Sequence, residues 1–152
     1  MATTNAEARQ QVLEAVGEAA DALGDALALL GTAYERLDEH TADQLEEQLF
    51  RPVQSAYGRV QRTYGDFAAR YEVPRRTFEP GAPGAPSQDA RHLIDAAVDA
   101  VARADGTLST LQDSMLPVEF GDPDLRAGLQ AVREAVGDIR SRARELVRAL
   151  GR

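Results

Sequence analysis

The chain has 152 residues, a size at which one domain can bury a self-sufficient core. It contains no cysteine, which excludes disulfides, thiolate catalysis and cysteine-based zinc or iron–sulfur sites. Its net charge of −8 argues against general affinity for nucleic acids or anionic membranes.

The sequence gives no sign of export or membrane insertion. Residues 1–8 lack both the basic segment and the apolar run of a signal peptide. No apolar stretch approaches the roughly 18 residues that cross a membrane. We therefore expect a cytoplasmic protein without a membrane partner.

The first predicted helix covers about residues 4–38. One of its heptad positions is always apolar, held by Val16, Leu23, Leu30 and Leu37. Beside this stripe, Gly17, Gly24 and Gly31 also repeat every seven residues, although each glycine destabilises a helix by about 1 kcal/mol relative to alanine. We favour sequence drift on a surface helix as the explanation. The alternative is a smooth ridge that another helix backbone approaches closely.

The second predicted helix covers about residues 42–72, after a capping-box spacing at Thr41 and Gln44. Pro52 lacks an N–H and disfavours helix before it, so we expect a kink or short break near residues 49–52.

Most of the large apolar side chains lie in this second helix, at heptad spacing. They are Phe50, Tyr57, Tyr64 and Tyr71 at one position and Val53, Val60 and Phe67 at the other. Such a stripe is typical of a packed helix interface, which is the interpretation we favour. The alternative is a cavity for a small apolar ligand, with candidate lining residues Tyr57, Tyr64, Phe67 and Met115.

Residues 74–88 contain four Pro and two Gly, the composition of an extended connection. This Pro/Gly-rich loop is longer than a helical bundle needs. We favour a plain linker, with two alternatives: a crossover, or a site where Phe78 and the Arg75/Arg76 pair contact a partner.

Two further helices are predicted, over about residues 88–116 and 123–150. Ser87 is the candidate N-cap of the former, and Asp122 with Pro123 starts the latter. Both keep the heptad repeat. The first shows it at Ile94, Ala97, Val101, Ala104, Leu108, Leu111 and Met115, and the second at Leu129, Val132, Val136, Ile139, Ala143, Leu146 and Leu150.

Four heptad-patterned segments predict an all-α fold: an antiparallel up-down-up-down, left-handed four-helix bundle forming one domain over residues 1–152. Its long loop joins the second and third helices. The charges fit this arrangement, because acidic segments alternate with basic ones. The net charge is −9 for residues 1–50, +4 for 51–76, −7 for 77–125 and +4 for 126–152. Unlike charges would then be neighbours around the ring.

No residue pattern supports catalysis, a cofactor or a metal site. A di-iron bundle needs paired Glu-x-x-His units, and the nearest pattern is a single Asp89-x-x-His92. In an up-down-up-down bundle His40 would lie at the opposite end, so the two histidines could not share a metal. The acids around His40 match no calcium loop, and no Gly-x-Ser-x-Gly or phosphate-binding glycine loop occurs.

The arginines supply the candidate interaction surface. It comprises Arg133, Arg140, Arg144 and Arg148 of the last helix together with Arg75, Arg76 and Phe78 of the loop. Nucleic acid is a weak candidate partner, since no aromatic residue lies among the helical arginines and the rest of the chain is acidic. We expect a non-enzymatic bundle that binds a protein partner or forms a homo-oligomer. A ligand-binding bundle is the alternative, and a carboxylate-type metalloprotein comes third.

Overall fold

The structure, a computed structural model, describes residues 4–150 and contains no β-strand within them, so the predicted all-α class is confirmed. Seven α-helices and one π-helix are formed in this range. They are α1 (Asn5–Tyr34), α2 (Glu39–Leu45), the π-helix η1 (Glu46–Phe50), α3 (Arg51–Tyr71), α4 (Ala90–Asp113), α5 (Leu116–Glu119), α6 (Pro123–Ala135) and α7 (Ile139–Leu150).

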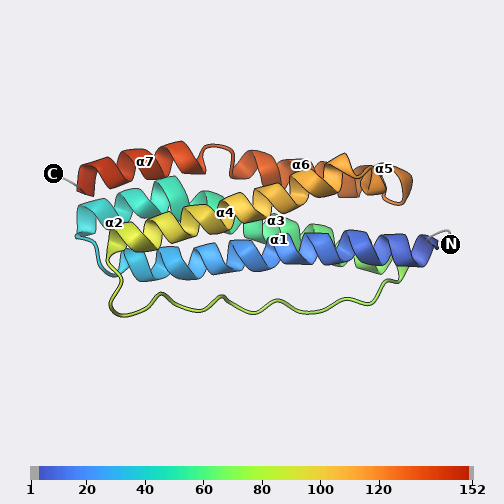
Figure 1. The fold of residues 1–152 in the computed structure, drawn as a ribbon, viewed down its shortest axis with the longest axis horizontal. Coiled ribbons are helices and arrows are strands. Elements are labelled where there is room, and N and C mark those ends of the chain that lie inside the picture. Colours follow the sequence, from blue (N-terminus) through green and yellow to red (C-terminus); the bar gives the residue numbers. More distant parts are fainter. Residues whose placement is uncertain (1–3, 151–152) are drawn as a thin grey trace.

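The helices form four long rods that lie side by side: α1, the continuous run α2–η1–α3, α4, and α6 followed by α7 (Figure 1). α1 packs against α3 and α4, and the α6–α7 rod also packs against α3 and α4. Each of these neighbouring rods runs antiparallel to the next (Figure 1).

The predicted up-down-up-down order is wrong, because α3 and α4 run in the same direction (Figure 1). The 18 residues between them, 72–89, carry the chain back along the whole bundle. Arg36, just after α1, donates to the carbonyls of Ala85 and Pro86, which places the start of α4 beside the end of α1. Heptad spacing specifies which helix face is buried but not the direction of the helix, and a loop of this length permits a crossover.

This order changes which charged helices are neighbours. α1 carries five acids and one Arg (net −4), and α4 carries four acids and two Arg (net −2). α3 and α7 each carry four Arg and one acid (net +3). Since acidic α1 packs on acidic α4, the predicted alternation around the ring is also wrong. Unlike charges meet along two borders, α1–α3 and α4–α7.

The irregularity expected near Pro52 is present as the π-helical turn η1, which keeps α2 and α3 continuous. Pro52 has no N–H, so the carbonyl of Gln48 lacks its α-helical partner. That carbonyl accepts a hydrogen bond from Arg142 Nη1 of α7 at 3.4 Å. A wider turn and a neighbouring arginine thus accommodate the proline without breaking the helix.

Two helix starts differ from the prediction because aspartates provide the caps. Asp38 caps α2 by accepting from the Thr41 N–H at 2.8 Å, so the second helix begins earlier than expected. Asp89, and not Ser87, caps α4. The hydrogen bonds that these caps accept from the backbone lower the pKa of both carboxyls.

The third and fourth predicted helices are each interrupted. α4 ends before Met115, whose left-handed φ of 66° turns the chain into the short α5. The fourth is divided at residues 136–138, where Gly137 is a poor helix former. Val136 and Ile139 are both buried, so the heptad register continues across the gap. Periodicity alone therefore could not reveal the break.

Candidate interaction surfaces

The aromatic stripe of α3 is packed core. Val53, Val60 and Phe67 are fully buried, and Tyr64 is 5% exposed. The Tyr64 ring meets the Phe78 ring edge to face at 4.8 Å, and its hydroxyl accepts the Arg76 backbone N–H at 3.0 Å. The chain itself thus satisfies the polar atom that a bound ligand would otherwise have to satisfy.

The other two tyrosines of the stripe are also engaged within the chain. Tyr71 donates to Asp122 Oδ2 at 3.1 Å, and the Arg9 guanidinium lies 4.0 Å from the centre of its ring. Tyr57 lies over Gly24, and its burial, together with the nearby charge of Asp21, raises the pKa of its hydroxyl. Both side chains serve packing between helices.

The predicted ligand-lining set is not gathered around one enclosed space. Phe67 is shut inside the core, whereas Met115 is 49% exposed at the turn between α4 and α5. Tyr64 faces Gly17 of α1 and the loop that follows α3. The structure therefore separates Met115 from the aromatic residues with which the sequence grouped it.

Residues 72–89, here called the strap, run beside α1 along the bundle (Figure 1), and hydrogen bonds join their first part to α3. Arg76 forms a two-pronged ion pair with Asp21 of α1, at 2.6 and 3.1 Å. The Gly84 N–H donates to Thr32 Oγ1 at 3.2 Å. A side chain at Gly81 would meet α1, since its Cβ would lie 2.6 Å from a backbone carbon. The strap is the crossover that the sequence left open, and the favoured linker interpretation is wrong.

The loop residues proposed to contact a partner contact the chain instead. The Arg76 guanidinium lies 4.5 Å from the centre of the Phe78 ring, and Phe78 packs on Tyr64. Arg75 is exposed, and its Nη1 lies 3.5 Å from the Gly65 carbonyl oxygen. Arg76 and Phe78 thus hold the strap down.

The heptad glycines of α1 have a packing role that differs from both sequence interpretations. The aromatic rings of Tyr64 and Tyr57 lie on Gly17 and Gly24, each 3.4 Å from where a Cβ would be. No helix backbone makes this approach. Gly31 has nothing within 4 Å of its Cβ position, so only this third glycine fits the drift that we favoured.

Arg133, one of the four helical arginines predicted to form a surface, is engaged within the chain. Its Nε donates to Asp105 Oδ1 at 2.8 Å and its Nη1 to Gln112 at 2.7 Å. The hydrogen bond that Arg133 donates to Asp105 raises the pKa of the guanidinium, because it favours the charged form. This residue joins α6 to α4.

Arg140, Arg144 and Arg148 are exposed on α7. Arg140 and Arg144 line a hollow of about 320 Å³ between α7 and α4, together with Asp95 and Asp99. The sequence pointed to these arginines but not to the aspartates. The predicted up-down-up-down order also makes the last two helices antiparallel neighbours, so their proximity could have been inferred, but no pattern in the sequence singled the aspartates out.

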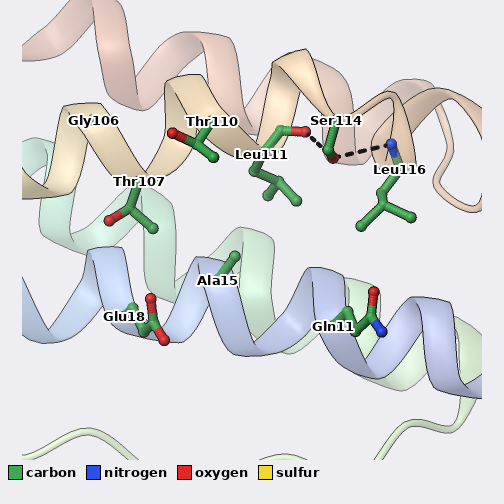
Figure 2. Close-up of a pocket in the computed structure, with 9 residues that line it drawn as sticks. All are labelled: Gln11, Ala15, Glu18, Gly106, Thr107, Thr110, Leu111, Ser114 and Leu116. Atoms are coloured by element: carbon green, nitrogen blue, oxygen red, sulfur yellow. Dashed lines mark hydrogen bonds between the residues drawn. The ribbon is translucent and has the colours of Figure 1, made fainter.

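A second, larger hollow of about 530 Å³ lies between α1 and α4 (Figure 2). Figure 2 shows small residues from both helices facing it, Ala15 from α1 and Gly106 and Thr107 from α4. At one end of it, Ser114 Oγ donates to the Leu111 carbonyl at 2.6 Å. The heptad pattern did not point to this groove, and its one atypical helix residue is Gly106, since glycine is a poor helix former.

The histidines lie at the same end of the bundle, contrary to expectation, because the strap returns the chain to the end where α2 begins (Figure 1). Both are exposed, and His92 Nδ1 lies 2.8 Å from Asp89 Oδ1. Within residues 4–150, no group of three or more His, Asp or Glu side chains is arranged to hold a metal ion. None of the helices in this range is long and apolar enough to cross a lipid bilayer.

No protein family model, curated protein or solved structure matches the chain. Function therefore has to be argued from these surfaces alone.

Proposed function

We propose that this protein is a small, non-enzymatic cytoplasmic helical bundle, left-handed as its heptad spacing predicts, that acts by binding another protein or a second copy of itself. One observation supports the proposal most: the large side chains of the interior are packed against other parts of the chain. Phe67 is fully buried, and the Tyr64 hydroxyl already accepts a hydrogen bond from the strap. Binding would then use the outer faces of the helices.

The alternative function, binding of a small apolar ligand, would need space beside the aromatic stripe. The rings of Tyr64 and Tyr57 instead fill the area above two glycines of α1. The hollow of about 530 Å³ between α1 and α4 has a suitable volume for a ligand. It is an open groove on the surface and not an enclosed cavity of the kind that buries most of a small ligand, which favours a protein surface as its natural partner.

Native mass spectrometry on protein purified without added ligands or metals tests the proposal. A monomer or small oligomer with no extra mass, followed by recovery of a stoichiometric complex with a protein partner or with itself, is the expected result. A stoichiometric adduct of a few hundred daltons, retained after buffer exchange, would contradict it and favour the ligand-binding alternative. One or two bound metal ions would instead favour a metalloprotein.

A further inference from the structure

The border between α4 and α7 is an open groove with an apolar floor. Two adjoining hollows of about 320 Å³ each lie along it and share Val98 and Arg140. Val98 and Val147 are half-buried on either side of the groove, above the buried Ala143. By contrast, a ring or a strap residue covers much of the α1–α3 border. The α4–α7 border is thus a place where unlike charges meet over an apolar floor without a covering segment.

The middle parts of the two edges of this groove carry opposite charges at matching heights, and Arg91 lies beside them on the α4 edge. Asp95 and Asp99 are exposed on α4, and Arg140 and Arg144 are exposed on α7. All four line the same hollow, so the acidic and basic pairs lie at the same level along the bundle. Among residues 4–150, no ion pair within 4.0 Å includes any of the four. Each edge therefore offers charges for a partner.

These features make the groove complementary to itself. A two-fold axis parallel to the helices, lying between two apposed grooves, would set α4 of each copy on α7 of the other. Asp95 and Asp99 would then face Arg144 and Arg140 of the second copy, while Val98 and Val147 of both copies would be enclosed between the four helices. A two-fold axis perpendicular to the helices would instead stack α4 on α4, aspartate against aspartate.

We infer that the α4–α7 border is a homodimer interface whose partner is a second copy of this chain, docked α4 on α7 about an axis parallel to the helices. The inference rests on the proposed function and specifies its partner. The charges select the axis, and the apolar floor contributes the area that becomes buried. Charge complementarity of this kind fixes register and suppresses the wrong arrangement.

Charge reversal on either edge tests the interface. The Asp95→Arg/Asp99→Arg variant places arginine against arginine in the dimer, and the Arg140→Asp/Arg144→Asp variant places aspartate against aspartate. Each variant alone should weaken the dimer by about 100-fold or more, because like charges brought together are strongly unfavourable. Sedimentation-velocity ultracentrifugation over a concentration series measures the dissociation constant.

Mixing the two variants provides the decisive measurement. In a mixed dimer the arginines introduced on α4 of one variant face the aspartates introduced on α7 of the other. The affinity should therefore return to within about tenfold of that of the unmodified protein. This recovery also shows that both variants are folded. An Arg59→Asp/Arg62→Asp variant, altered equally in charge on the outer face of α3, should dimerise as the unmodified protein does.

Three results would overturn the inference: an unmodified protein that remains monomeric at about 100 μM, a dimer that neither reversal weakens, or reversal variants that fail to recover on mixing. A monomer that still forms a stoichiometric complex with a different protein would sink the dimer interface and leave the proposed function standing. A monomer that instead retains a small-molecule adduct would contradict both the dimer interface and the proposed function.

Discussion

A close approach between two rods lies where Gly128 of α6 meets Thr63 of α3, and Gly128→Ala tests it. A methyl group at Gly128 would lie 2.8 Å from Thr63 Cγ2 and 3.1 Å from Thr63 Cβ, and closer still to Oγ1. Thr63 is only 7% exposed, and its β-branched side chain has few rotamers. Relief thus requires α3 and α6 to move apart.

Two opposing effects set the magnitude. Replacing glycine by alanine inside a helix stabilises by about 1 kcal/mol, whereas overpacking a buried contact destabilises by about 1 to 3 kcal/mol. We expect Gly128→Ala to lower the free energy of unfolding by about 1 kcal/mol. Urea denaturation followed by circular dichroism, with an unchanged m-value, measures it.

Gly31→Ala is the matched control, because nothing lies within 4 Å of its Cβ position. It should raise the free energy of unfolding by up to about 1 kcal/mol. In the background of Thr63→Ala, which removes Oγ1 and Cγ2, Gly128→Ala should become neutral or stabilising. If Gly128→Ala stabilises as Gly31→Ala does, the close approach of α3 and α6 is refuted.

Substitutions at three further residues probe the strap and the junctions. Asp122→Asn should lower stability at pH 7 by about 1 to 2 kcal/mol, because Asp122 accepts two hydrogen bonds from Arg70, at 2.6 and 2.8 Å. Burial acts to raise the pKa of Asp122, but the hydrogen bonds from Arg70 and others outweigh it and the pKa is lowered. The stability difference should thus be full above about pH 4 and vanish as the pH falls through the lowered pKa, in melts from pH 7 to 2.5; a constant difference would contradict the ion pair. Tyr64→Ala should lower stability by about 3 to 5 kcal/mol and Tyr64→Phe by about 1 kcal/mol, and a nearly unchanged melting temperature for the alanine variant would contradict packed core. Gly81→Ala, whose methyl would strike the α1 backbone at 2.6 Å, should speed hydrogen exchange at the Gly84 amide at least about tenfold, and unchanged exchange would show that the strap is not seated there.

The buried faces could be predicted from the sequence because they depend on local periodicity alone. Val53, Val60 and Phe67 recur every seven residues, and all three are fully buried. A helix of 3.6 residues per turn must bring such residues to one side, whatever the rest of the chain does. The existence of the long helices followed from the same signal.

The order of the rods could not be predicted in this way, since a heptad stripe reads the same in either direction. The charge pattern favoured one order, and that prediction was wrong because exposed ion pairs contribute only about 0 to 1 kcal/mol each to stability. Contacts of the strap favour the observed order instead, among them the ion pair of Arg76 with Asp21 and the hydrogen bond from the Gly84 amide to Thr32. The α4–α7 border, by contrast, is common to the predicted and the observed order, because the last two predicted helices are antiparallel neighbours in both.

The length of the strap also determines which order of helices the chain can adopt. α4 has 24 residues and is therefore roughly 36 Å long at about 1.5 Å per residue. An extended chain advances about 3.3 Å per residue, so about 11 residues are the least that can return from the end of α3 to the start of α4. The strap's 18 residues exceed this minimum by about seven. With fewer residues than this minimum, the strap could not return to the start of α4, so α4 would have to run in the opposite direction. The same buried faces would then assemble into the other ring order, and the acidic edge of α4 would be reversed along the bundle.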